Sequence, residues 1–227
     1  IITTARDGLA IIWDVKTKQQ LVQFKGHKNG VWTGMFSPDG KLAVTASADR
    51  TARVWDVQTG KQLHVLAGHS DLVTSAAFSA DGKRIVTTSV DSTARIWDTD
   101  TGQLLLILKG HTREVTDAVF SPTDPYVATS SRDHTVIVWN ADTGAEIVHL
   151  LGHSKDIAHL AFSPDGKYLL TASLDGTARI FLVHYEDVLA LAQSLLSPRE
   201  LTCAERLTYL HEKLVCPTPT SILTPTP

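Results

Sequence analysis

The sequence provides little for disulfide bridges or membrane spans. Its 227 residues include only two cysteines, Cys203 and Cys216, both near the C-terminal end. A chain of this size without a disulfide framework is typical of an intracellular protein, and we expect a cytoplasmic location. The apolar run from Leu104 to Leu108 is far shorter than the ~20 residues of a membrane-spanning helix. It is predicted to be a buried strand, so no membrane partner is expected.

Clustered positive charge and metal-ligand motifs are also scarce. The net charge is −3 with ten histidines taken as neutral, which argues against a nucleic-acid partner because phosphate binding needs clustered Lys and Arg. Four histidines stand alone, at His64, His134, His149 and His159. No glycine-rich phosphate loop occurs either. We therefore expect no metal and no cofactor.

What the sequence does have is a repeat. Its copies read "GLAIIWD", "RTARVWD", "STARIWD", "HTVIVWN" and "GTARIFL", and they end at a constant interval of 42 residues from Asp14 to Leu182. A Gly-His pair recurs at the same interval, at Gly26-His27, Gly68-His69, Gly110-His111 and Gly152-His153. A constant interval without insertions indicates one structural unit stacked on itself.

Each unit has the pattern of four short antiparallel strands. In the unit that starts at His69, the strand-like segments are 73–78, 83–89, 93–98 and 104–109. The turn after the first segment contains Asp81-Gly82, and glycine accepts the positive φ that a tight hairpin needs. Four strands in 42 residues is typical of a β-propeller blade, in which stacking covers the sheet faces that one blade leaves exposed.

The Gly-His starts and Trp-Asp ends resemble the WD40-repeat family of β-propellers. The resemblance covers residues 1–183 and implies an all-β fold of nearly five blades: an incomplete blade at 1–25, complete blades at 26–67, 68–109 and 110–151, and an incomplete blade at 152–183. Family propellers usually close with seven blades. We therefore expect an open arc or a strained small ring, whose raw strand edges favour association. The sequence begins at Ile1 within the repeat pattern, so we expect it to be part of a longer protein.

Histidine, serine, aspartate and tryptophan recur at constant offsets within the units. The sets are His27, Ser47, Asp49 and Trp55; His69, Ser89, Asp91 and Trp97; His111, Ser131, Asp133 and Trp139; and His153, Ser173 and Asp175, with Phe181 in place of the Trp. The first copy keeps Asp7 and Trp13 and has Ala5 at the serine position.

These sets are predicted to be structural tetrads and not catalytic groups. Ser, His and Asp can form a hydrolase triad, but a triad is needed once, and no Gly-x-Ser-x-Gly elbow surrounds these serines. In the structural alternative, the Asp accepts backbone N–H groups and an imidazole N–H, and the Ser bridges the imidazole and the indole. The resemblance implies the same structural role. We expect no enzyme activity.

Partner binding is expected at positions that differ between the copies. In related propellers, partners often dock on the face that carries the residue before the tetrad Asp and the start of the innermost strand. The candidate contact residues at these positions are Arg6, Trp32, Glu114, Arg132 and Asp156. Trp32 differs most, because the other copies have Thr or Ala there, and Trp and Arg are frequent in binding hot spots. The alternative is that Trp32 fills a gap in the central channel.

The pattern becomes helical after Val183. Apolar residues of segment 184–214 recur at helical spacing, and Thr202 with Glu205 forms a capping box. Two short helices docked on the last blade are expected there. Residues 215–227 are rich in Pro and Thr and are expected to be disordered. This ending resembles the C-terminal tails of bacterial WD40 proteins, many of which are large signalling ATPases.

The sequence thus predicts a non-catalytic scaffold or sensor platform that binds a protein or peptide on its propeller face. It is expected to be the C-terminal WD40 part of a larger bacterial signalling protein. One alternative is a regulatory propeller fused to an upstream kinase, protease or signalling ATPase. Another is a stand-alone scaffold without such a module.

Overall fold

The computed structural model describes residues 1–184, and every helix or strand in this range is a β-strand. The strands are β1 (Ile2–Thr4), β2 (Ala10–Trp13), β3 (Gln20–Phe24), β4 (Val31–Phe36), β5 (Leu42–Ser47), β6 (Thr51–Asp56), β7 (Gln62–Ala67), β8 (Val73–Phe78), β9 (Arg84–Ser89), β10 (Thr93–Asp98), β11 (Leu104–Lys109), β12 (Val115–Phe120), β13 (Tyr126–Ser131), β14 (Val136–Asn140), β15 (Glu146–Leu150), β16 (Ile157–Phe162), β17 (Tyr168–Ser173) and β18 (Ala178–Leu182). Two helices were expected at 184–214 and disorder at 215–227. Apart from His184, both segments lie outside the described residues. Residues 1–184 contain no helix with the length and apolarity that crossing a membrane requires.

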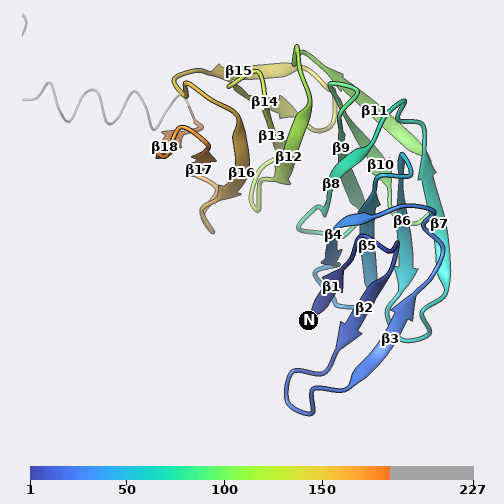
Figure 1. Ribbon diagram of the computed structural model, residues 1–227. Coiled ribbons are helices and arrows are strands. Elements are labelled where there is room, and N and C mark those ends of the chain that lie inside the picture. The colour runs from blue at the N-terminus through green and yellow to red at the C-terminus, as the bar shows by residue number, and fades with distance from the viewer. Residues whose placement is uncertain (185–227) are drawn as a thin grey trace, which may run out of the picture. The chain divides into compact units, whose positions relative to one another are not determined.

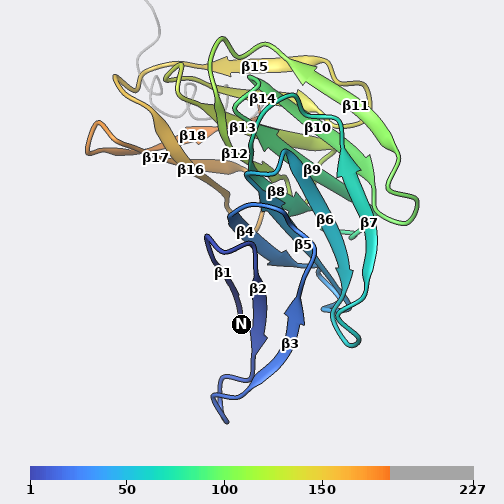
Figure 2. The ribbon, with the colours of Figure 1, turned by 45° about the vertical axis from the view of Figure 1, so that its right-hand side comes forward.

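The strands form five antiparallel sheets, each made of strands that follow one another in the chain. β4–β7, β8–β11 and β12–β15 form three four-stranded sheets, and β1–β3 and β16–β18 form two three-stranded sheets. Within residues 1–184 the sheets follow one another in chain order along an open arc, with the β1–β3 and β16–β18 sheets at its two ends (Figures 1 and 2). The innermost strands β4, β8, β12 and β16 contact one another in turn. The expected all-β propeller of nearly five blades is confirmed.

Local hairpin chemistry explains where the strands end. In the sheet of β8–β11, the Asp81 carboxylate accepts hydrogen bonds from the Lys83 amide at 3.1 Å and the Ser79 hydroxyl at 2.6 Å. Gly82 follows with a φ of 72°, a left-handed conformation in which a side chain would be strained. The Ser-x-Asp-Gly segment therefore closes a tight turn between β8 and β9, as the sequence predicts.

The core lies between the sheets. We call the face of a sheet that meets the next sheet in the chain its leading face, and the opposite face its trailing face. Val86 and Ile96 on the leading face of the β8–β11 sheet pack against Val127 and Trp139 on the trailing face of the β12–β15 sheet, and all four are buried. A single sheet would expose these side chains, so stacking provides the hydrophobic stabilisation of the arc.

The repeated tryptophan is part of this inter-sheet packing. The Trp55 ring lies in a stacked arrangement against Phe24 of the preceding sheet, with ring centroids 5.0 Å apart. Trp97 and Trp139 occupy the same place in their own sheets and are also buried. Each tryptophan thus presents its ring to the preceding sheet and leaves its indole N–H to be satisfied within its own sheet.

Candidate functional site

The recurring polar residues form a continuous hydrogen-bond network inside each sheet. In the β12–β15 sheet, His111 Nδ1 lies 2.9 Å from Asp133 Oδ2, and His111 Nε2 lies 2.8 Å from Thr129 Oγ1. The Trp139 indole N–H donates to the same Thr129 hydroxyl at 2.8 Å. The network therefore joins the loop that carries the histidine to two strands of the sheet.

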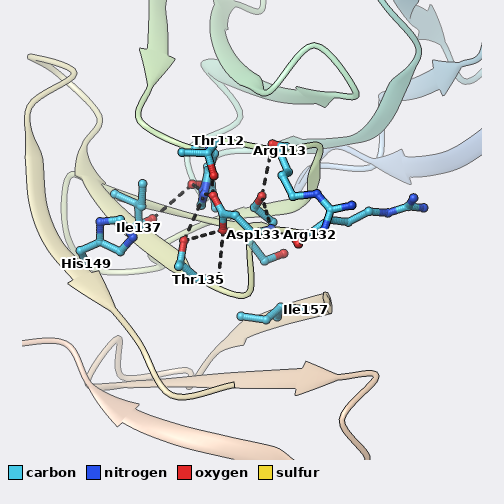
Figure 3. Close-up of polar contacts among 12 residues, drawn as sticks. Thr112, Arg113, Arg132, Asp133, Thr135, Ile137, His149 and Ile157 are labelled. Atoms are coloured by element: carbon cyan, nitrogen blue, oxygen red, sulfur yellow. Dashed lines mark hydrogen bonds and ion pairs between the residues drawn. The ribbon is translucent and has the colours of Figure 1, made fainter. Parts of the chain in front are cut away.

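The aspartate also holds its own turn. Asp133 accepts the Thr112 amide at 2.9 Å, the Thr135 amide at 3.0 Å and the Thr135 hydroxyl at 2.7 Å, as Figure 3 shows. One carboxylate thus accepts hydrogen bonds both from the loop that carries His111 and from its own turn. Hydrogen bonds to a charged group are stronger than those between neutral groups.

The bridge between the two rings is a threonine, so the expectation that Ser47, Ser89, Ser131 and Ser173 bridge them is wrong. The bridging residues are Thr45, Thr87, Thr129 and Thr171, which lie 2.8–2.9 Å from the histidine Nε2 atoms. Ser131 instead donates to the Arg113 carbonyl at 3.2 Å and accepts the Asp133 amide at 3.0 Å. The physical reason is the place of each residue in the strand. Ser131 is the last residue of β13 and lies next to the turn, whereas Thr129, two residues earlier, lies within reach of the Trp139 indole.

The hydrogen bonds of each network have a fixed direction. An indole only donates and a carboxylate only accepts, so with a neutral imidazole the order is Trp N–H to Thr, Thr O–H to His Nε2, and His Nδ1–H to Asp. Burial lowers the pKa of His27, His69 and His111, and the neighbouring aspartates offset this only in part. The neutral imidazole that the order requires is thus the favoured form.

The aspartates stay ionised in these networks. Burial raises the pKa of Asp49, but hydrogen bonds from Thr51, the Lys28 amide and His27 outweigh it and lower the pKa to about 2. The pKa of Asp91 is likewise lowered to about 2, because its hydrogen bonds outweigh the effect of burial. An ionised carboxylate beside a neutral imidazole satisfies every partner.

This geometry contains no serine nucleophile with a histidine base. Both nitrogens of His69 are engaged, by Asp91 at 2.9 Å and by Thr87 at 2.9 Å. The Ser89 hydroxyl donates to the Asp71 carbonyl at 3.2 Å. A hydrolase triad needs a hydrogen bond between its nucleophile and its base, and this arrangement gives the serine a backbone partner instead.

The two end sheets keep part of the network. Trp13 donates to Thr3 at 2.8 Å, so the first sheet has the indole and threonine members. His153 in the last sheet lies 2.8 Å from both Asp175 and Thr171, but Phe181 has no N–H to donate. The Thr171 hydroxyl also lies 3.4 Å from the Arg179 carbonyl, an alternative acceptor.

A groove opens beside Trp32, among residues that differ between the repeats. It has a volume of about 520 Å³ and is lined by Trp32, Thr33, Leu72, Thr74, Val90, Glu114 and Arg132. Three consecutive sheets contribute to it. Half of the Trp32 side chain is exposed (50%), so the residue does not fill a closed gap in the channel. Its indole forms an apolar wall together with Leu72 and Val90.

The tryptophan replaces a structural threonine. The Thr74 hydroxyl donates to the Val115 carbonyl of the next sheet at 2.6 Å, and the Thr116 hydroxyl donates in the same way to Ile157. Trp32 stands at the equivalent position of β4 and cannot make this bond. The second sheet thus has an exposed aromatic ring where the third and fourth have an inter-sheet hydrogen bond.

Arg132 gives the groove a charged wall. Its guanidinium lies 3.2 Å from Glu114 and 3.6 Å from Asp156, yet the side chain is 49% exposed. His134 also approaches Asp156, at 3.6 Å. The two carboxylates hold the arginine in place while part of it faces solvent.

The candidate contact residues are thus only partly brought together. Trp32, Glu114 and Arg132 line the groove, and Asp156 lies beside Arg132 without lining it. Arg6 is exposed next to Gly30, and it is not among the lining residues.

The candidate set left out the apolar part of the groove. Leu72 stands where other copies have Gly30, Glu114 or Asp156, and Val90 precedes its tetrad aspartate. For Leu72, an apolar residue at a loop position that is polar or small in the other copies was the available sequence signal. Within residues 1–184, no three His, Cys, Asp or Glu side chains gather closely enough to hold a metal ion.

Comparison with known proteins agrees with the geometry. The family model described as "WD domain, G-beta repeat" matches four consecutive segments, at residues 18–56, 60–98, 102–140 and 144–181. A search of the curated proteins gives no significant match. The four segments cover most of the chain, and each ends at or just after the Trp, or its Phe replacement, of one network. The chain therefore belongs to the WD40-repeat family, whose repeat domains are generally non-catalytic scaffolds for protein interactions.

Proposed function

We propose that this chain binds a protein or peptide partner in the groove beside Trp32. The observation that carries the proposal is the half-exposed Trp32 at the wall of a groove of about 520 Å³. Exposed aromatic rings next to apolar side chains are frequent centres of binding energy. A partner side chain placed against Trp32, Leu72 and Val90 would remove apolar surface from water.

The charged wall supports a polar contact at the same place. Arg132 keeps donors available to solvent while Glu114 and Asp156 fix its position. An arginine held in advance loses less side-chain freedom when it binds a carboxylate or a carbonyl group of a partner. The groove thus combines an apolar anchor site with a pre-positioned donor, and an extended peptide segment can use both.

We also propose the wider setting that the sequence suggests, namely a signalling or sensor role in a larger bacterial protein with a cytoplasmic location. The support is the cysteine content and the resemblance of the segment after Val183 to tails of bacterial WD40 proteins.

Selection from a random peptide library tests the groove directly. The library is panned on the 227-residue chain, and the affinity of the enriched peptides is then measured for Trp32→Thr, which introduces the residue that two other repeats, with Thr74 and Thr116, carry at this position. We expect the enriched peptides to bind Trp32→Thr at least about tenfold more weakly, because the aromatic wall is lost. Arg132→Ala should weaken the same peptides as well.

A matched control distinguishes binding in the groove from nonspecific binding to exposed apolar side chains. Leu63 is an exposed apolar residue on β7 and does not line the groove, so Leu63→Ala should leave peptide affinity unchanged. Peptides that bind the chain and Trp32→Thr equally well would contradict the proposed site, as would a library that yields no binder.

A further inference from the structure

An arginine makes one of the contacts between the β8–β11 sheet and the β12–β15 sheet. The guanidinium of Arg84, at the start of β9, donates to the Ala141 carbonyl at 3.0 Å and to the Asp142 carboxylate at 2.7 Å. It also lies over the Phe120 ring, with 5.6 Å between the Cζ atom and the ring centroid. A carbonyl, a carboxylate and an aromatic face thus form a complete arginine site between these two sheets.

The pair of sheets one repeat earlier has the same acceptors but no arginine. One interval of 42 residues earlier, the carbonyl, carboxylate and ring positions are occupied by Thr99, Asp100 and Phe78. The position of Arg84 is occupied by Leu42, which packs against the buried cluster that contains Phe78. Leucine is shorter than arginine and has no side-chain N–H to donate. Residue 42 therefore cannot supply the hydrogen bonds that Arg84 makes between the later sheets.

A groove lies at this position between the β4–β7 sheet and the β8–β11 sheet. It has a volume of about 500 Å³, and Leu42, Thr99 and Asp100 are among its lining residues. It is bordered by the β4–β5 turn of one sheet and by the β8–β9 and β10–β11 turns of the next. Trp32 stands near the start of β4, at the other end of that strand. The groove is therefore distinct from the one beside Trp32.

Thr99 brings an unsatisfied hydroxyl to the lining of this groove. Its Oγ1 atom is buried and has no hydrogen-bond partner within residues 1–184, and the residue is only 3% exposed. The other repeats have apolar residues at this position, namely Val15, Val57, Ala141 and Val183. Burying a hydroxyl without a partner costs free energy, and a bound hydrogen-bonding group would remove that cost. This hydroxyl indicates a ligand independently of the charges around it.

The charges of the groove favour a cation. Asp39, Asp81 and Asp100 line it, and Lys83 is the one cationic side chain among the described lining residues. Lys41, beside the groove, pairs with Asp39 at 3.4 Å. Asp100 is exposed, and its carboxylate forms no ion pair within residues 1–184. In the same range no three carboxylates lie close enough to hold a metal ion, so a larger cation with several donors fits this groove better.

We propose that this groove binds an arginine side chain of a protein or peptide partner. The guanidinium donates to the Asp100 carboxylate and the Thr99 carbonyl, as Arg84 does to the equivalent groups one repeat later, and the aliphatic stem lies against Leu42. Arginine fits better than lysine, because its planar fork of donors reaches a carboxylate and a carbonyl together. The inference is independent of the role proposed for the groove beside Trp32.

Peptides with a fixed central arginine and random flanking residues are the probes for the first test. The library is panned on the 227-residue chain, and the enriched peptides are measured again with citrulline or lysine in place of the arginine. Citrulline keeps the shape of arginine without its charge, so we expect it to weaken binding at least about tenfold, and lysine to weaken it less. Equal affinity of the citrulline peptides, tighter binding of the lysine peptides or a library without a binder would overturn the proposal.

Two variants of the chain locate the binding. Leu42→Arg supplies the guanidinium from within the chain, as Arg84 does one repeat later, so the peptides should bind at least about tenfold more weakly. Its melting temperature should stay within about 2 °C of the parent or rise. Asp100→Asn changes an exposed side chain, should leave the fold intact and should also weaken the peptides about tenfold.

Asp142→Asn is the matched control. Asp142 is exposed, holds the position of Asp100 in the next repeat and is already paired with Arg84, so this variant should bind the peptides like the parent. Peptides that bind Leu42→Arg and Asp100→Asn as tightly as the parent would overturn the proposal. So would peptides that only Trp32→Thr weakens, because their binding would belong to the other groove.

Discussion

The indole N–H of Trp97 donates to the hydroxyl of Thr87 at 2.8 Å, between two adjacent strands of one sheet. The same hydroxyl lies 2.9 Å from His69 Nε2. A single threonine thus connects the ring that packs against the preceding sheet to the loop that begins the repeat. The relationship recurs in three sheets, and it accounts for the constant spacing of the Gly-His and Trp-Asp segments better than any catalytic arrangement does.

Replacing Asp91 should strongly destabilise the fold. The Asp91 carboxylate accepts hydrogen bonds from His69, the Ser70 amide and Thr93, so Asp91→Ala leaves several buried donors without an acceptor. We expect a loss of about 2–4 kcal/mol in the free energy of unfolding. Asp100→Ala, in the exposed turn after β10, should cost little. Urea titrations of both variants test this, and equal losses would contradict the assigned roles.

Stability should fall as the pH is lowered from neutral. His27, His69 and His111 have folded-state pKa values below the ordinary 6.5, so the unfolded chain takes up these protons first and stability declines below about pH 6.5. Asp49 and Asp91 titrate at about 2 instead of 3.8, so each adds a loss on the order of 2 kcal/mol between about pH 5 and pH 2.

Unfolding free energies measured at several pH values between 7.5 and 3 check this dependence. Asp91→Asn, which cannot ionise, should show a shallower decline below about pH 5 than the parent chain. A parent chain with the same stability at about pH 7 and pH 4 would contradict the described networks.

Removing Trp32 should not harm the fold. The residue is half exposed, and its counterpart Thr74 makes a hydrogen bond to the next sheet, so Trp32→Thr can introduce an equivalent bond to the Val73 carbonyl. We expect the melting temperature to stay within about 2 °C of the parent or to rise. Acrylamide should quench much less of the remaining tryptophan fluorescence. A large drop in melting temperature would indicate that Trp32 is a packing residue.

The recurring serines should not support hydrolysis. Esterase, protease and phosphatase substrates should react with this chain at background rates, because the Ser89 hydroxyl bonds the Asp71 carbonyl and no histidine. An activity that Ser89→Ala abolished, in a variant that remained folded, would overturn this reading of the site.

The strand bounds of the repeat could be predicted almost to the residue. Strands β8, β10 and β11 have the predicted bounds, and β9 begins one residue later, at Arg84. The Asp-Gly turns and the β-branched segments determine the strand bounds locally, because the register of a hairpin is fixed by its turn and by the alternation of buried and exposed side chains. The 42-residue interval then repeats it along the chain.

The bridging threonine was missed even though the predicted hairpin contained the answer. Thr87 pairs with Arg95 and lies diagonally across from Trp97, within reach of its indole. Ser89 lies four residues beyond Ile85, the strand partner of Trp97, or about 13 Å along the strand. Both residues recur at the interval of 42, so recurrence alone could not choose between them.

The groove could not be derived in the same way. Its lining comes from three sheets, and Leu72 and Val90 meet Trp32 only when those sheets stack. Sequence comparison between repeats could single out the unusual tryptophan, but the volume beside it depends on the distance between neighbouring loops.

The free energies of unfolding of Thr87→Val and Thr87→Ser test the central claim most directly. Valine keeps the shape of threonine but leaves the Trp97 N–H and His69 Nε2 without their partner, so we predict a loss of about 2–4 kcal/mol. Serine keeps the hydroxyl and loses one methyl group, so its loss should stay below about 1.5 kcal/mol. In the Val variant, the indole proton of Trp97 should also exchange faster with solvent. Equal and small losses for both variants, with an unchanged indole proton, would contradict the claim that this hydroxyl ties each repeat together.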